Sequence, residues 1–172
     1  MQEPISPEDV FALHKLRRAN LRRYLDIVNE WLRKNPKNFR AYFQTAFRVE
    51  RRGEPRRALA DLNKVVELAP TPAAFCARGR VYRQIGEHEN ALADFRRGEA
   101  MNPKESEDAA ITLLYQADSH ALLGDAANAL ACCARLRDDF WTPGLDGAPG
   151  GGKAEIAKEL RRIAAEARRA GV

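Results

Sequence analysis

A pattern of glycines and alanines recurs three times along the chain, and it constrains the fold more than any other feature. Gly53, Gly86 and Gly124 are each followed five residues later by Ala-Leu-Ala. Each glycine is also preceded by a small residue seven positions earlier and by a bulky apolar residue eleven positions earlier. Because every column keeps its register, the pattern predicts an internal repeat of about 34 residues.

Each unit of the repeat reads as two helices joined by a glycine turn. The bulky and the small residue are four positions apart, so they share one face of a first helix. The glycine favours a left-handed turn that ends this helix. The Ala-Leu-Ala run lies in a second helix, where small side chains let two helix axes approach closely. Pro70 and Pro103 close the first two units, just past a helix end, and Thr71-Pro72 is typical of a helix start.

The succession of aromatic, small, glycine, alanine, apolar and proline columns resembles the tetratricopeptide repeat. The resemblance covers residues 39–70, 72–103 and 110–141. The middle unit matches best, through Phe75, Gly79, Tyr82, Gly86, Ala91, Phe95, Gly98 and Pro103. It departs from the family at Arg78, where leucine is usual. The third unit departs at His120, Cys133 and Trp141.

Helical segments are predicted on both sides of the repeats. Residues 7–35 carry an apolar helical pattern, which predicts either a cap on the first unit or a surface for homodimer formation. Residues 142–152 are rich in glycine and proline and predict a flexible loop. Residues 153–170 predict an amphipathic helix with Ile156, Leu160 and Ile163 on one stripe. This helix should cover the open end of the last unit, or alternatively fold back and block the groove.

The predicted fold is therefore all-α, one domain spanning residues 1–172. The resemblance implies an antiparallel helix-pair solenoid, a right-handed superhelix with N-terminal and C-terminal capping helices. The family's concave face is lined by the first helix of each unit. Projected onto this sequence, that groove holds Arg40, Phe43, Gln44, Phe47 and Glu50, then Ala73, Cys76, Ala77, Arg80, Arg83 and Gln84, then Ile111, Leu114, Tyr115, Asp118 and Leu122.

Aromatic and arginine side chains are the residues from which binding hot spots are made. The groove is therefore expected to bind a protein or peptide with apolar anchors and acidic residues, as an adaptor or chaperone. In having three repeats preceded by a helical segment, this chain is similar to bacterial secretion chaperones of this family, although those tend to be acidic. Some members of the family grip a C-terminal carboxylate with lysine and asparagine, but Phe43, Phe47 and Tyr115 occupy the equivalent columns here.

Charge and composition leave one rival function open. Lysine and arginine number 29 against 24 acidic residues, a net charge of +5. The arginine pairs at 17–18, 22–23, 51–52 and 56–57 suggest a nucleic-acid-binding surface, but they alternate with acids, so this partner is not the expected one. There is no secretory signal and no apolar run of membrane-spanning length, and the three cysteines form no disulfide framework. A cytoplasmic location is expected.

No enzymatic site is predicted. Gly147 to Lys153 has the spacing of a phosphate-binding loop, but no strand is predicted before it and Ala154 stands where serine or threonine is needed. Cys132 and Cys133 are adjacent and lack further ligands at metal-binding spacing. His14, His88 and His120 have no catalytic companions at a recognisable spacing. We therefore expect no catalytic residue, cofactor or metal.

Overall fold

The computed structural model describes Tyr42, Ala46 and residues 53–101, 107–144 and 147–171. The chain divides into two compact units, Met1–Ala69 and Pro70–Val172. The boundary coincides with the end of the first predicted repeat at residue 70. In the first unit, α4 spans Pro55–Leu68 and buries Ala58, Leu62 and Val65, which share one helical face. The predicted helix at 7–35 lies outside the described residues.

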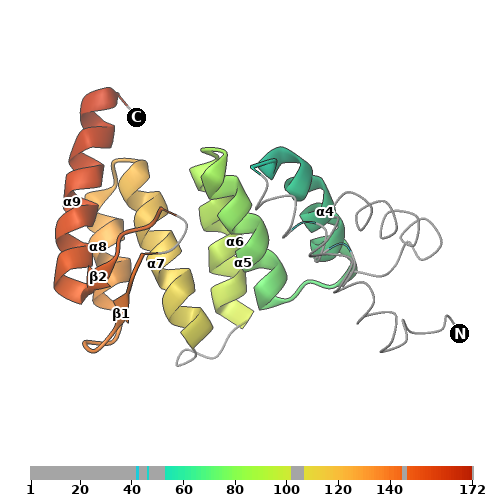
Figure 1. Ribbon diagram of the computed structural model, residues 1–172, viewed down its shortest axis with the longest axis horizontal. Helices are drawn as coiled ribbons and strands as arrows, with labels where there is room; N and C mark the ends of the chain where they lie inside the picture. The colour runs from blue at the N-terminus through green and yellow to red at the C-terminus, as the bar shows by residue number, and fades with distance from the viewer. Residues whose placement is uncertain (1–41, 43–45, 47–52, 102–106, 145–146, 172) are drawn as a thin grey trace, which may run out of the picture. The chain divides into compact units, whose positions relative to one another are not determined.

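The second unit begins with two helix pairs (Figure 1). The first pair is α5 (Pro72–Gln84) and α6 (His88–Met101), and the second is α7 (Glu107–Leu122) and α8 (Ala126–Ala134). A short antiparallel pairing of β1 (Trp141–Thr142) with β2 (Gly151–Gly152) follows, and α9 (Lys153–Ala170) ends the fold. The fold is all-α, as predicted, apart from these two-residue strands. No helix in the described part of the chain is long and apolar enough to cross a membrane.

Glycine turns close the first helix of each pair. Gly86 and Gly124 have positive φ angles of 81° and 74°. In each turn the residue after the glycine donates its backbone N–H to a carbonyl five residues back, at 2.9 Å for Glu87 and Tyr82 and 2.8 Å for Asp125 and His120. This hydrogen bond is the signature of a left-handed helix end. The recurrent glycines therefore do what the sequence pattern predicts.

Close packing explains the small residues of the repeat. A Cβ atom placed on Gly79 of α5 would lie 2.7 Å from Cε1 of Phe95 on α6. Phe95 is fully buried, so its ring fills the space that the glycine leaves. Ala91, one turn earlier on α6, is also fully buried. Any larger side chain in these columns would separate the two helices.

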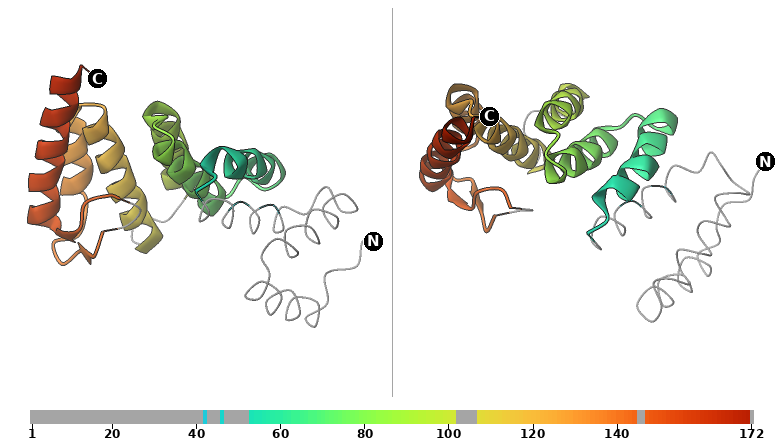
Figure 2. Two further views of the ribbon diagram at one scale, coloured as in Figure 1. Left: turned by 45° about the horizontal axis from the view of Figure 1, so that its top comes forward. Right: turned by 90° about the horizontal axis from the view of Figure 1, so that it is seen from above.

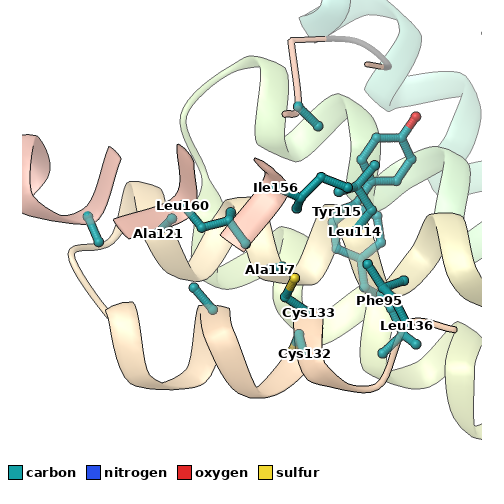
Figure 3. Packing of buried hydrophobic residues seen from close by; sticks show 14 of the residues in the cluster. Phe95, Leu114, Tyr115, Ala117, Ala121, Cys132, Cys133, Leu136, Ile156 and Leu160 are labelled. Atoms are coloured by element: carbon teal, nitrogen blue, oxygen red, sulfur yellow. The ribbon is translucent and has the colours of Figure 1, made fainter. Parts of the chain in front are cut away.

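The C-terminal helix completes the core of the second unit. It packs against both α7 and α8, and the views in Figure 2 show the three helices side by side. Figure 3 shows Ile156 and Leu160 of α9 pointing into the cluster that holds Leu114, Tyr115 and Cys133. At the far end of α9, the guanidinium Nε of Arg168 donates to the Gly124 carbonyl at 2.6 Å. The helix therefore covers the last pair along its whole length.

The segment between α8 and α9 is more ordered than the flexible loop that the sequence predicts. Its two ends pair as β1 and β2, and Thr142, Ala148 and Pro149 are buried. Ala148 belongs to the same apolar cluster as α9. The glycines allow this course because Gly144 and Gly151 have φ angles of 90° and 108°. The glycine content therefore serves tight local geometry.

Candidate functional site

The first helix of the middle repeat offers an open face. Ala73 and Gln84 are exposed, and Cys76, Ala77 and Arg80 are partly exposed. Their spacing along α5 places them on one side of the helix. We call these five residues the α5 stripe. Small side chains at its centre leave room for a ligand backbone, while Arg80 and Gln84 add a cation and an amide.

The next first helix, α7, is largely closed on the corresponding side. Of the residues projected onto the groove there, Ile111 and Leu122 are partly exposed, whereas Leu114, Tyr115 and Asp118 are buried. Arg83 on α5 is buried as well. This differs from the expectation that all of them line an open groove. The reason is that α9 and the segment around Ala148 pack into the same cluster as Leu114 and Tyr115.

Arg83 and Asp118 form a buried ion pair between α5 and α7. The distance from Nη1 to Oδ2 is 2.5 Å, and the side chains are 6% and 2% exposed. The Arg83 guanidinium also lies 5.2 Å from the centre of the Tyr115 ring, which stacks on Phe95. Burial raises the pKa of the Asp118 carboxyl, and the charge of Arg83 opposes that shift. Arg83 and Asp118 therefore join α5, which carries the α5 stripe, to α7.

Further polar contacts join α7 to the middle repeat. Thr112 donates to Cys76 Sγ at 3.8 Å, Gln116 donates to Glu99 at 2.8 Å, and Arg96 Nη2 lies 3.4 Å from Nε2 of His120. We call these three contacts and the Arg83–Asp118 pair the polar junction. Its residues on α7 include three spaced four apart, at 112, 116 and 120. That spacing is visible in the sequence, but sequence reasoning did not identify it as an interface.

The unusual Arg78 also has a partner within the repeat. Its Nε and Nη2 donate to the two carboxylate oxygens of Asp94 at 2.6 and 2.7 Å. Asp94 is almost fully buried on α6. The carboxylate of Asp94 therefore faces the position at which the resemblance to the tetratricopeptide repeat would place leucine.

The other candidate chemistries have structural roles. Lys153 donates to the Leu136 carbonyl at 2.8 Å and to Asp138 at 2.9 Å, so its amine binds protein groups. Burial raises the pKa of the Cys132 and Cys133 thiols, which keeps them protonated and weakly nucleophilic. Within the residues that the structure describes, no His, Cys, Asp and Glu side chains are grouped as a metal site requires.

Comparison with known proteins identifies one repeat of the chain. A family model for the tetratricopeptide repeat matches residues 72–105, the segment that contains α5 and α6. Residues 72–105 therefore match a tetratricopeptide repeat. The match falls on the repeat whose columns the sequence satisfies best. A search of curated protein sequences finds no match.

Solved structures with a similar fold cover most of the chain. A crystal structure of MamA protein matches with a TM-score of 0.66 and 16% identity, covering 91% of this chain and 84% of the other. A second crystal structure of MamA matches with a TM-score of 0.68 and 17% identity, covering 98% of each chain. At these identities the likeness concerns the fold alone.

Proposed function

We propose that this tetratricopeptide-repeat protein is an adaptor or chaperone that binds an extended or helical segment of another protein on the first helices of its repeats. The repeat match and the fold support a protein–protein interaction module. The observation that carries the finer proposal is the α5 stripe, which stays open where the equivalent face of α7 is closed. Cys76, Cys132 and Cys133 form no disulfide, which fits a reducing compartment such as the cytoplasm.

The side chains of the α5 stripe indicate what kind of peptide would bind there. Arg80 would pair with an acidic residue of the ligand, since a guanidinium binds a carboxylate in a planar, two-bonded geometry. Ala77 and the partly exposed Ile111 would receive a small apolar anchor. Gln84 offers both a donor and an acceptor for the ligand backbone. A peptide with an apolar anchor next to an acidic residue would match the chemistry of these groups.

The proposed contact residues differ in part from the projected ones. Cys76, Arg80, Gln84 and Ile111 remain direct contacts. Leu114, Tyr115, Asp118 and Arg83 become supporting residues because the chain itself covers them. The proposal also keeps the first-unit groove residues, which lie outside the described part of the chain: Arg40, Phe43, Gln44 and Phe47.

The decisive experiment is a capture of native partners from cytosol at physiological salt. The wild-type chain is compared with Arg80→Glu and with Arg97→Glu, an exposed charge reversal on α6 away from the stripe. Circular dichroism first establishes that all three chains are equally helical. The proposal expects a protein held by the wild type and by Arg97→Glu but lost by Arg80→Glu. Equal capture by all three would refute the assignment to the stripe.

Nucleic acid is the alternative partner, and the described surface does not favour it. Arg57, Arg137 and Arg162 are exposed arginines whose guanidinium groups pair with carboxylates of the chain. Such pairs reduce the charge available to a phosphate backbone. Recovery of the same salt-sensitive nucleic acid by all three chains would support this alternative. The projected homodimer through residues 7–35 is tested by the oligomeric state in the same preparations.

A further inference from the structure

His120 stands where three helices meet. It lies in the last turn of α7 and is almost fully buried. Its Nε2 is 3.4 Å from Nη2 of Arg96 on α6, and its Nδ1 is 3.3 Å from Oδ2 of Asp125. Asp125 in turn caps α8 by accepting the Asn128 backbone N–H at 3.1 Å. One imidazole ring therefore connects the middle repeat to both helices of the third.

The two neighbours fix the protonation state that satisfies both contacts. A guanidinium can only donate hydrogen bonds, so Nε2 must accept. A carboxylate can only accept, so Nδ1 must carry the proton. Both conditions hold for the neutral ring alone. A second proton on Nε2 would face the positive charge of Arg96 and would remove the acceptor that Arg96 needs.

The charges around the ring come from every element packed near it. Arg96 faces it from α6, and Asp125 faces it from the turn before α8. From α9, Arg168 binds the Gly124 carbonyl in the same turn. On α8, the Cys132 thiol lies near both Arg96 and Asp125 but is kept neutral by burial. Burial lowers the pKa of His120, and the Asp125 carboxylate partly opposes this.

We propose that His120 is a proton-binding site that controls how firmly the third repeat is stacked on the second. The neutral ring holds Arg96 and Asp125 together across the polar junction. The protonated ring keeps Asp125 but releases Arg96, so the contact between α6 and α7 weakens. This inference concerns the packing of the repeats and does not depend on any ligand.

The sign of the pH dependence follows from the direction of the shift. A histidine whose pKa is lower in the folded state binds its proton more readily when the junction opens. Its stabilising contribution is complete above the unfolded pKa of about 6.5 and is lost as the pH falls through that value toward the folded pKa. As the pH falls, the equilibrium constant for opening the polar junction should rise. The rise is at most about tenfold for each pH unit by which the pKa of His120 in the folded state lies below its unfolded value.

The test measures the ring and the junction separately in the full chain. Nuclear magnetic resonance gives the ring pKa of His120 in the wild type and in two variants. Arg96→Gln removes the opposing charge and should raise that pKa, whereas Asp125→Asn removes the favourable one and should lower it. Amide hydrogen exchange, corrected for the intrinsic pH effect, should show α7 less protected at about pH 5.5 than at about pH 7.5.

Matched substitutions identify the residue responsible. His120→Gln keeps an acceptor for Arg96 but does not titrate, so it should abolish the pH difference in α7 protection. His88→Gln removes a partly buried histidine whose pKa is also lowered by burial, and it should leave the difference intact. If His88→Gln abolishes it instead, the proposal is wrong. The proposal is also wrong if the His120 ring has an ordinary pKa that Arg96→Gln does not change. This second measurement does not require His120→Gln to fold.

Discussion

Arg83 and Asp118 are 35 positions apart in the sequence, yet they form a charge pair from which water is almost excluded. The pair joins the first helices of two successive repeats. Most of the contact of α7 with the middle repeat is made through α6, so α5 depends on few side chains to reach it. The ion pair is therefore a main connection between the open α5 stripe and the closed face of α7.

Removing one member of this pair should be more harmful than removing both. Asp118→Ala leaves a buried guanidinium without its carboxylate and should lower the free energy of unfolding by about 3 kcal/mol. The double variant Arg83→Met with Asp118→Leu should recover most of that loss, because no buried charge remains. Urea unfolding followed by circular dichroism measures both. A double variant as unstable as the single one would show that the ion pair itself is irreplaceable.

The pair within the middle repeat offers a second test. Replacing Arg78 by leucine, the residue usual in the family, should destabilise this chain by about 3 kcal/mol, since Asp94 would be left buried without its partner. Adding Asp94→Ala to Arg78→Leu should restore stability. Thermal unfolding compares the two chains with wild type. An Arg78→Leu variant of unchanged stability would mean that Asp94 finds water or another donor.

The contact of Gly79 with Phe95 predicts a compensating change. Gly79→Ala improves helix propensity by about 1 kcal/mol, but its Cβ would overlap the Phe95 ring, so we expect a net loss of about 1–2 kcal/mol. Phe95→Leu alone should also destabilise by leaving a cavity. Combined, the two changes should cost less than the sum of their separate effects. Additive losses in chemical denaturation would contradict direct packing between these positions.

The cysteines should differ in reactivity. Cys76 is partly exposed on the α5 stripe, whereas Cys132 and Cys133 are buried and have raised thiol pKa values. Iodoacetamide at about pH 7.5 should modify Cys76 at least about tenfold faster than the other two. Peptide mass spectrometry after timed quenching gives the three rates. Equally fast modification of Cys133 would indicate that the contact of α8 with α9 opens readily.

Particular residues show how far the sequence could predict this structure. The columns around Gly86 and Ala91 predicted the helix pair and its turn, because glycine conformation and close packing are local requirements. The helix at residues 153–170 follows from its own apolar stripe. The groove was harder to predict. The repeat columns predict that Leu114 and Tyr115 line an open groove, and nothing local to α7 reveals that a segment about 30 residues later packs against them.

The ion pairs were missed for a related reason. Arg78 was recognised as a departure from the family, but its partner Asp94 lies on another helix, and charge spacing predicts neighbours only within a helix. Burial of Arg83 and Asp118 likewise depends on how two repeats stack. Such tertiary contacts determine which projected residues face a partner and which support those that do.

The C-terminal helix also has a consequence for how the array can change in evolution. In the fold, α9 takes the place that the first helix of a further repeat would take against α7 and α8. Its outward side carries charged residues in place of a packing surface, among them Lys158, Arg161 and Arg169. A repeat appended after Ala170 would meet a helix face on which charged residues are prominent. An added repeat is therefore accommodated more readily by insertion ahead of α9 than by addition after it.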